Sequence, residues 1–394
     1  MRASPTQEEI RRHNLGVLLR YVHVKGPTSR AELTASLGLN RSTIGALTAD
    51  LTAAGLVREE LPRDHGRTGR PSLVVRPEHE RVYAYAFAVE VDRLTAARVG
   101  LGGVVLDRHE VPRGPDADVV EPLAAFVRRT ESAVGADTVC VGSGAAVSAM
   151  ARRADGRVYL GDAAELEETL AAGLTAALSE FRKAAPPVAV RNVADLAALA
   201  EHTRGVAVGC DNVIYLHGDA GVGGGIIAGG RAVTGHGGHG GEVGHMVVNP
   251  QGRGCGCGSQ GCWETEIGEY ALLRAADRDG TGRQAVSDVV DAARRGDVVA
   301  QAAVRQVGRW LGFGVANLVN IFNPEMVIFG GTLRDVYLAS ATQVRERLTR
   351  MALPACREHV RLRTPDLADD APLYGAAELA FERLLADPLD AAAA

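Results

Sequence analysis

The chain has 394 residues, of which 46% are hydrophobic and 23% are charged, so it is long enough for two or three domains with real cores. Its net charge of −5 is unevenly distributed: residues 1–76 hold 12 basic and 7 acidic residues, and the remainder is acidic. No apolar run approaches the roughly 18 residues of a membrane helix, and the first residues lack the apolar core of a secretory signal. These features argue against a membrane protein and favour a cytoplasmic one whose basic end contacts a polyanion.

The basic segment 1–76 predicts a winged helix-turn-helix domain. Apolar residues at helical spacing predict a first helix that ends before Pro27. Ser29 is placed to cap a short second helix, and Asn40 to cap a third helix over residues 41–55. The third helix is therefore expected to enter a DNA major groove.

The candidate DNA contacts lie at the start of the third helix and in a predicted β-hairpin wing. The apolar positions of the third helix fall on one face, which leaves Arg41, Ser42 and Thr43 pointing outward. The wing has three arginines beside glycines, a composition suited to a narrow minor groove: Arg63, Arg67 and Arg70. The alternative for this segment is a small protein-interaction domain.

From residue 81 onward, strand-like apolar runs alternate with helical stretches rich in alanine and leucine. This alternation predicts an α/β architecture, and the distribution of the strands predicts two lobes with a ligand cleft between them. The expected first lobe comprises residues 80–193 plus 371–390, and the expected second lobe comprises residues 194–370.

The segment 218–230 follows a predicted strand and contains many glycines. Glycines let backbone amides approach an anion or a sugar, but they also form tight turns. The segment alone therefore leaves a phosphate cradle and simple turns as alternatives.

A metal site is predicted within residues 236–266. Cys255, Cys257 and Cys262 have the spacing C-x-C-x4-C, and His245 lies ten residues upstream as a fourth ligand. Three thiolates and one imidazole form a closed tetrahedral zinc site with no position for a reacting water, so the zinc is expected to be structural. The competing fourth ligands are His236 and His239, and the alternative for all these histidines is a glycine-rich surface loop.

These residues resemble the ROK family of repressors, open reading frames and kinases. The segment from Gly240 to Glu264 and the run from Asn320 to Gly331 follow that family's patterns, and the similarity covers roughly residues 80–385. The resemblance implies an actin-like, hexokinase-like pair of α/β lobes. A winged helix-turn-helix in front of it is a feature of the family's transcriptional regulators, which implies an operator DNA partner and a homo-oligomer, either a dimer or a dimer of dimers.

The resemblance also implies which residues contact a sugar. Glu242, His245 and Glu264 match the family's sugar-binding glutamates and histidine, and Asn192 matches its sugar-binding asparagine. Carboxylates accept paired hydrogen bonds from vicinal hydroxyls, and the zinc would hold the loop that presents them.

The sequence departs from the family's kinases at the catalytic position. Val193 stands where those kinases have the aspartate that acts as general base, and valine cannot take a proton. Asp195 is two residues further along a starting helix, which turns its side chain by about 200° from that position. No catalytic residue is therefore assigned.

The phosphate-binding patterns of the kinases are changed too. The segment 90–94 lacks the glycine of the first phosphate motif, and Asp219 places an acid in the second phosphate loop. The family's Pro-Gly turn is replaced by Ala146 and Val147. The sequence thus predicts a sugar-responsive DNA-binding regulator, most simply a repressor, with lost kinase activity. The alternatives are a sugar kinase, a bifunctional kinase and regulator, and a ligand-independent DNA-binding dimer with a structural zinc.

Overall fold

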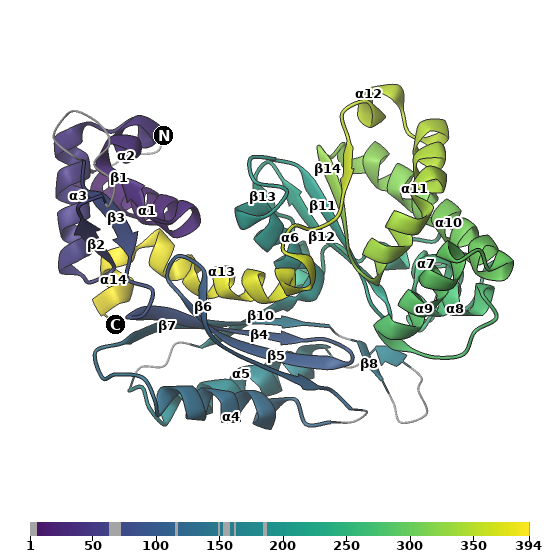
Figure 1. The fold of residues 1–394 in the computed structure, drawn as a ribbon, viewed down its shortest axis with the longest axis horizontal. Coiled ribbons are helices and arrows are strands. Elements are labelled where there is room, and N and C mark those ends of the chain that lie inside the picture. Colours follow the sequence, from purple (N-terminus) through teal and green to yellow (C-terminus); the bar gives the residue numbers. More distant parts are fainter. Residues whose placement is uncertain are drawn as a thin grey trace.

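The computed structural model of the protein describes residues 6–62, 72–114, 117–148, 150–152, 158–160, 163–183 and 187–393. Figure 1 shows an amino-terminal helical module beside two α/β lobes. This arrangement agrees with the predicted fold class. No helix in the described ranges has the length and hydropathy needed to cross a membrane.

The amino-terminal module has three helices and a small sheet. Helix α1 spans Gln7–Lys25, α2 spans Arg30–Leu37 and α3 spans Arg41–Ala53. Strands β1 (Thr28–Ser29), β2 (Val57–Glu60) and β3 (Val74–Pro77) form an antiparallel sheet in the order β1-β3-β2. The predicted wing arginines Arg63, Arg67 and Arg70 lie outside the described residues.

The first lobe contains a five-stranded sheet in the order β10-β7-β4-β5-β6. Strands β4 (Val82–Val89), β7 (Val139–Val147) and β10 (Val188–Asn192) are parallel, and β5 (Arg93–Gly100) and β6 (Val104–Pro112) add antiparallel neighbours. Helices α4 (Val120–Glu131) and α5 (Ala163–Ser179) cover one face, with the short hairpin β8 (Met150–Arg152) and β9 (Val158–Leu160) between them in sequence. The central strand β4 is buried along its whole length, as parallel strands covered on both faces are.

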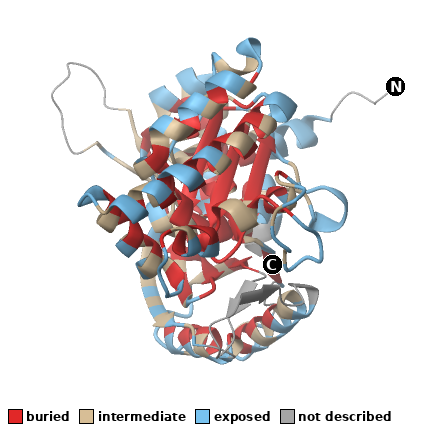
Figure 2. Ribbon diagram, turned by 90° about the vertical axis from the view of Figure 1, so that its right-hand side faces the viewer, coloured by how far each residue is buried: buried red, intermediate tan, exposed pale blue. Residues whose placement is uncertain are grey.

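The second lobe contains a five-stranded sheet in the order β13-β12-β11-β14-β15. Its strands are β11 (Val213–Gly218), β12 (Val222–Ala228), β13 (Arg231–Ala232), β14 (Met326–Gly331) and β15 (Arg361–Arg363). The helices of this lobe are α7 (Glu264–Ile267), α8 (Glu269–Ala275), α9 (Gly282–Arg294), α10 (Val298–Phe322), α11 (Thr332–Met351) and α12 (Pro354–Arg357). Figure 2 shows the buried sheet beneath partly exposed helices.

Three helices connect the parts of the molecule. Helix α6 (Val193–Arg204) lies between the lobes, and α13 (Ala371–Ala386) runs from the second lobe to the amino-terminal module, followed by α14 (Pro388–Ala393). One hydrophobic core contains α1 residues such as Leu18 together with Phe381 and Leu384 of α13. The amino-terminal module is therefore packed onto the first lobe through a shared core.

One apolar run that looks like a single strand in the sequence forms two strands in the structure. Residues 94–106 comprise most of β5, a turn and the start of β6. Gly102 and Gly103 have φ values of 102° and 82°, a conformation that glycine adopts without strain. These two glycines reverse the chain and place β6 beside β5.

Candidate functional site

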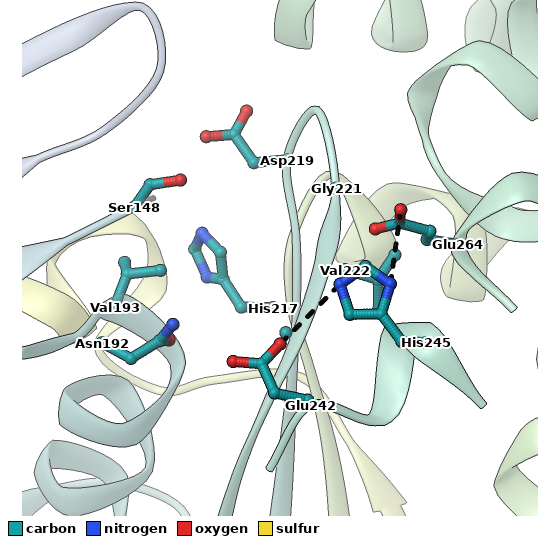
Figure 3. A pocket seen from close by; sticks show the side chains of 11 residues that line it. Ser148, Asn192, Val193, His217, Asp219, Gly221, Val222, Glu242, His245 and Glu264 are labelled. Carbon is teal, nitrogen blue, oxygen red and sulfur yellow. Dashed lines mark ion pairs between the residues drawn. The ribbon is translucent and has the colours of Figure 1, made fainter. Parts of the chain in front are cut away.

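A cleft between the lobes gathers most of the predicted ligand-binding residues (Figure 3). Its lining comes from the end of β7, the start of α6, the β11–β12 hairpin and the loop that precedes α7. The lining residues are Ser148, Asn192, Val193, His217, Asp219, Gly221, Val222, Gly223, Glu242, His245 and Glu264. The cleft therefore contains all four predicted sugar contacts, which are Asn192, Glu242, His245 and Glu264.

Asn192 is held at the entrance of α6 by its own capping bond. Its Oδ1 accepts a hydrogen bond from the backbone N–H of Ala194 at 2.8 Å. The capping oxygen is thus engaged, and the side-chain NH₂ group supplies the donors that a ligand hydroxyl needs.

The glycine-rich segment after β11 forms strand β12 rather than a free loop. A Cβ atom on Gly225 would clash with the backbone of Ala194, and one on Gly224 would approach the side chain of Val243. These glycines therefore let α6 and the metal-ligand loop lie close to β12. The structure thus adds close strand packing to the two roles that the sequence left open, which were a phosphate cradle and simple turns.

His245, Cys255, Cys257 and Cys262 form the cluster that the cysteine spacing predicted. Their ligand atoms all lie within 4.8 Å of one another. The Sγ atoms of Cys257 and Cys262 are 3.7 Å apart, and Sγ of Cys255 is 3.6 Å from Nδ1 of His245. A tetrahedral ion with metal–sulfur bonds of about 2.3 Å requires sulfur atoms about 3.8 Å apart. The donors and their spacing thus fit a tetrahedral metal ion.

The loop around the cluster is fixed at both ends. Gly261 has a φ of 76° and lies against the backbone of Asn249, where a side chain would not fit. Trp263 is fully buried and donates a hydrogen bond from Nε1 to the backbone oxygen of Trp310 in α10 at 2.8 Å. His236 and His239, the competing ligands, are exposed and are absent from the cluster among the described residues.

The imidazole of His245 links the metal-ligand cluster to the cleft. Nδ1 faces Cys255, whereas Nε2 lies 3.9 Å from a carboxylate oxygen of Glu242. Figure 3 shows His245 between Glu242 and Glu264. A metal bound at Nδ1 would fix the tautomer with the proton on Nε2, which then points toward the cleft.

His217 and Ser148 are cleft residues that the sequence analysis missed. His217 is 5% exposed, and its Nδ1 has no hydrogen-bond partner among the described residues. Burial, with a smaller contribution from Arg283, lowers the pKa of His217 to about 4, so the imidazole is neutral at pH 7. The one sequence feature that could have indicated His217 as a cleft residue is its position as a single histidine inside the apolar run of β11.

The helix-turn-helix residues lie on the exposed side of the amino-terminal module. Asn40 caps α3, and its Oδ1 accepts hydrogen bonds from the backbone N–H of Thr43 at 2.8 Å and from the hydroxyl of Ser42 at 2.7 Å. Arg41 and Ser42 are exposed and Thr43 is half-buried. Arg30 pairs with both carboxylate oxygens of Glu59, which ties α2 to β2.

A family model identifies the protein family of the chain. The ROK family model matches residues 87–383, which is more than half of the sequence. The chain belongs to the ROK family. The match covers both lobes, the cleft and the metal-ligand loop.

Proteins named as repressors and proteins named as kinases are similar to this ROK protein over different lengths. The xylose repressor of Bacillus spizizenii is 26% identical over 388 residues, covering 96% of this chain and 97% of that protein. The glucokinase of Streptomyces coelicolor is 32% identical over 311 residues, covering 74% of this chain and 95% of that protein. A solved ROK transcriptional regulator, described as a homologue of Escherichia coli Mlc, has the same fold, with a TM-score of 0.74 and 24% identity over 98% of this chain and all of its own.

The position that the resemblance assigned to the base of the family's kinases holds a buried apolar side chain. Val193 is 5% exposed and lines the cleft directly after Asn192. Asp195 lines a different cavity, beside Arg191 and Arg231. Burial and the charge of Glu242 raise the pKa of Asp195 to about 7, although Arg191 opposes the shift. Asp195 therefore lines the neighbouring cavity and is not among the described residues that line the cleft beside Val193.

The end of the cleft at Asp219 is acidic. Burial and the carboxylates of Glu90, Asp92 and Glu269 raise the pKa of Asp219 to about 7, despite the opposing charge of Arg283. Arg93 donates two hydrogen bonds to Glu90, at 2.8 and 2.5 Å. The nearby cations are thus already engaged by the protein's own acids, and a triphosphate would meet negative charge.

Proposed function

We propose that the chain is a DNA-binding transcriptional regulator, most simply a repressor, whose affinity for its operator changes when a sugar enters the cleft. The observation that carries this proposal is the combination of an exposed recognition helix with a sugar-type cleft in which Val193 replaces the base. The end-to-end similarity to a xylose repressor supports it. Arg41, Ser42 and Thr43 would contact the major groove, and the wing arginines Arg63, Arg67 and Arg70 would follow the minor groove.

The proposed ligand is a neutral sugar or sugar derivative. Glu242 and Glu264 would accept hydrogen bonds from hydroxyls, while Asn192 and Nε2 of His245 would donate them. No arginine or lysine is among the lining residues of the cleft that the structure describes. A phosphate ester would therefore bring its charge next to carboxylates without a cation to balance it.

The proposed cofactor is one structural zinc ion held by His245, Cys255, Cys257 and Cys262. Zinc matches the soft thiolate donors and the four-ligand set, which is closed to a reacting water. In this role the metal orders the loop that presents Glu242 and Glu264 to the cleft.

We further propose that this ROK protein has lost kinase activity and acts in the cytoplasm as a dimer or a dimer of dimers. Loss of activity is supported by Val193 and by the acidic phosphate side around Asp219. Residues 1–76, 80–193 with 371–390, and 194–370 are the proposed domains. A dimer would place two recognition helices on paired half-sites, as helix-turn-helix proteins commonly do.

Isothermal titration calorimetry with a panel of neutral sugars and their phosphate esters tests the ligand-binding part of this proposal. One neutral sugar is expected to bind, and Glu242→Ala is expected to abolish binding. Glu358→Ala, an exposed glutamate in the second lobe, is the matched control and should bind normally. Tighter binding of phosphate esters, or binding unaffected by Glu242→Ala, contradicts the proposal.

A further inference from the structure

Helix α6 connects the sugar-type cleft to the DNA-binding module. Its first turn borders the cleft, because Asn192 caps the helix and Val193 lines the cavity. Its last residue is Arg204, and twelve residues at 1.5 Å each give a rod of about 18 Å. A displacement at the capped end is therefore carried to Arg204 without an intervening loop.

Arg204 binds three separate parts of the protein. Its Nε donates a hydrogen bond to Glu378 of α13 at 2.5 Å. One terminal nitrogen donates to the backbone oxygen of His23 in α1 at 3.2 Å, and the other donates to the backbone oxygen of Gly102 at 3.3 Å. The side chain of Arg204 is 12% exposed. The guanidinium group thus joins α6 to the last turn of the first DNA-module helix, to α13 and to the β5–β6 turn.

His23 completes this buried group. It is fully buried, and its Nδ1 accepts a hydrogen bond from the backbone N–H of Gly102 at 2.9 Å. Nδ1 therefore carries no proton, and Nε2 donates to Glu378 at 3.2 Å. Burial holds the pKa of His23 below its ordinary value, so the charge of Glu378 is balanced by Arg204. Removing Arg204 would leave a buried carboxylate without its counter-ion.

The first turn of α6 is held between β12 of the second lobe and α13. A Cβ on Gly225 of β12 would clash with the backbone of Ala194, and a Cβ on Gly375 of α13 would clash with the backbone of Leu196. Such close backbone contacts leave no room for α6 to shift without moving β12 or α13. Packed interfaces of this kind change between discrete arrangements rather than deforming gradually.

We propose that α6 transmits occupancy of the cleft to the DNA-binding module, and that Arg204 is the positioning residue that couples α6 to α1. This inference rests on the proposed function, because it assigns the route by which a sugar at Asn192 alters DNA affinity. Arg204 is not among the described residues that line the sugar cleft. Its role is to keep α1 in a fixed relation to α6 through the hydrogen bonds to Glu378 and His23.

The test measures the coupling ratio, which is the DNA dissociation constant with the sugar divided by that without it. Coupling ratios in allosteric proteins are commonly about 5 to 150, and Arg204→Gln is expected to bring the ratio below about 2. Arg204→Lys keeps the positive charge for Glu378 but cannot form the same fork of directed bonds, so it should fold and still have a reduced ratio. Sugar affinity without DNA should stay within about threefold of the wild-type value.

The matched control is Arg108→Gln, which removes an exposed ion pair between β6 and Asp370, a bond that involves neither α6 nor α1. It should keep the wild-type coupling ratio. The proposal is overturned if both Arg204 variants keep the wild-type coupling ratio. It is also overturned if Arg108→Gln lowers the coupling ratio as much as the Arg204 variants do.

A double-mutant cycle separates this inference from the proposed function, because it needs no sugar. Asn192→Ala removes the cap at the cleft end of α6 and is expected to change DNA affinity in the wild-type chain but not in Arg204→Lys. The two substitutions should therefore be non-additive. One outcome is a non-additive cycle although no sugar changes the DNA affinity of the wild-type chain. In that case the proposed function is wrong and the connection through α6 is supported. An additive cycle overturns the connection.

Discussion

A carboxylate oxygen of Glu264 lies 3.7 Å from Nδ1 of His245, so the metal-ligand loop and the cleft share a boundary. His245 belongs to the metal-ligand cluster and lines the cleft as well. A metal that orders the metal-ligand loop would therefore also fix the positions of the cleft side chains that a sugar would contact.

Loss of the metal should abolish the sugar response while leaving DNA binding intact. Cys257→Ser removes one thiolate ligand, so the purified protein should lose its zinc and its sugar-induced change in DNA affinity. The helices of the DNA-binding module share a core with α13 that includes no residue of the metal-ligand loop, so they should still bind the operator. Metal content by mass spectrometry and DNA binding by anisotropy measure the two effects. Cys356→Ser, in α12 and outside the cluster, is the control and should behave as wild type.

Asp219→Asn should stabilise the protein at high pH. Because burial and neighbouring carboxylates raise the pKa of Asp219 from 3.8 to about 7, its ionised form reduces the free energy of unfolding above pH 7. Each pKa unit corresponds to about 1.4 kcal/mol, so the gain at pH 8 is a few kcal/mol at most. The gain should shrink between pH 7 and pH 4, as the folded wild-type chain takes up a proton.

Thermal unfolding at pH 8 and pH 5 measures this difference. Asp288→Asn, on the exposed side of α9, is the control and should show no such pH dependence. An Asp219→Asn effect that is equal at both pH values would show that Asp219 does not carry this buried charge.

The wild-type chain should release no more ADP from ATP in the presence of a sugar than the variant Glu242→Ala does. Val193→Asp places a carboxylate at the family's catalytic position, yet it should not restore activity, because the acidic phosphate side around Asp219 remains. A coupled assay measures ADP release by the wild-type chain and by the two variants. Sugar-dependent turnover by the wild-type chain, removed by Glu242→Ala, would establish a kinase.

The parts of the site that depend on local sequence were predictable. Ser29 and Asn40 each accept a hydrogen bond from the backbone N–H three residues later, as capping residues do. The cysteine spacing predicted the cluster, because three thiols within eight positions are brought together by the loop itself. The choice of His245 over His236 and His239 follows in the structure from the bridge between Val247 and Cys262, which brings His245 beside the thiols.

The features that depend on distant contacts were not predictable. The bond between Arg204 and Glu378 joins residues 174 positions apart, and no periodic pattern marks either one. His217 lies in an apolar strand, and its position in the cleft depends on how the two lobes meet. The turn at Gly102 was hidden because the apolar alternation continues across it.

Arg41→Ala should weaken DNA binding at the start of α3. If the arginine contacts a phosphate, the slope of log K against log salt should fall by about 0.9, and if it contacts a base, discrimination at one position should fall by about 1–3 kcal/mol. Binding of operator variants over a salt series separates the two outcomes. Arg305→Ala, exposed on α10 of the second lobe, should change neither quantity.

The central claim is that one sugar changes the affinity of this ROK protein for a specific DNA sequence. Fluorescence anisotropy with DNA from upstream of its own gene and neighbouring genes, in the presence and absence of a sugar panel, measures this directly. The account predicts sequence-selective binding that weakens with salt and changes with one neutral sugar. Binding that no sugar alters, or that shows no preference for any sequence, would contradict it.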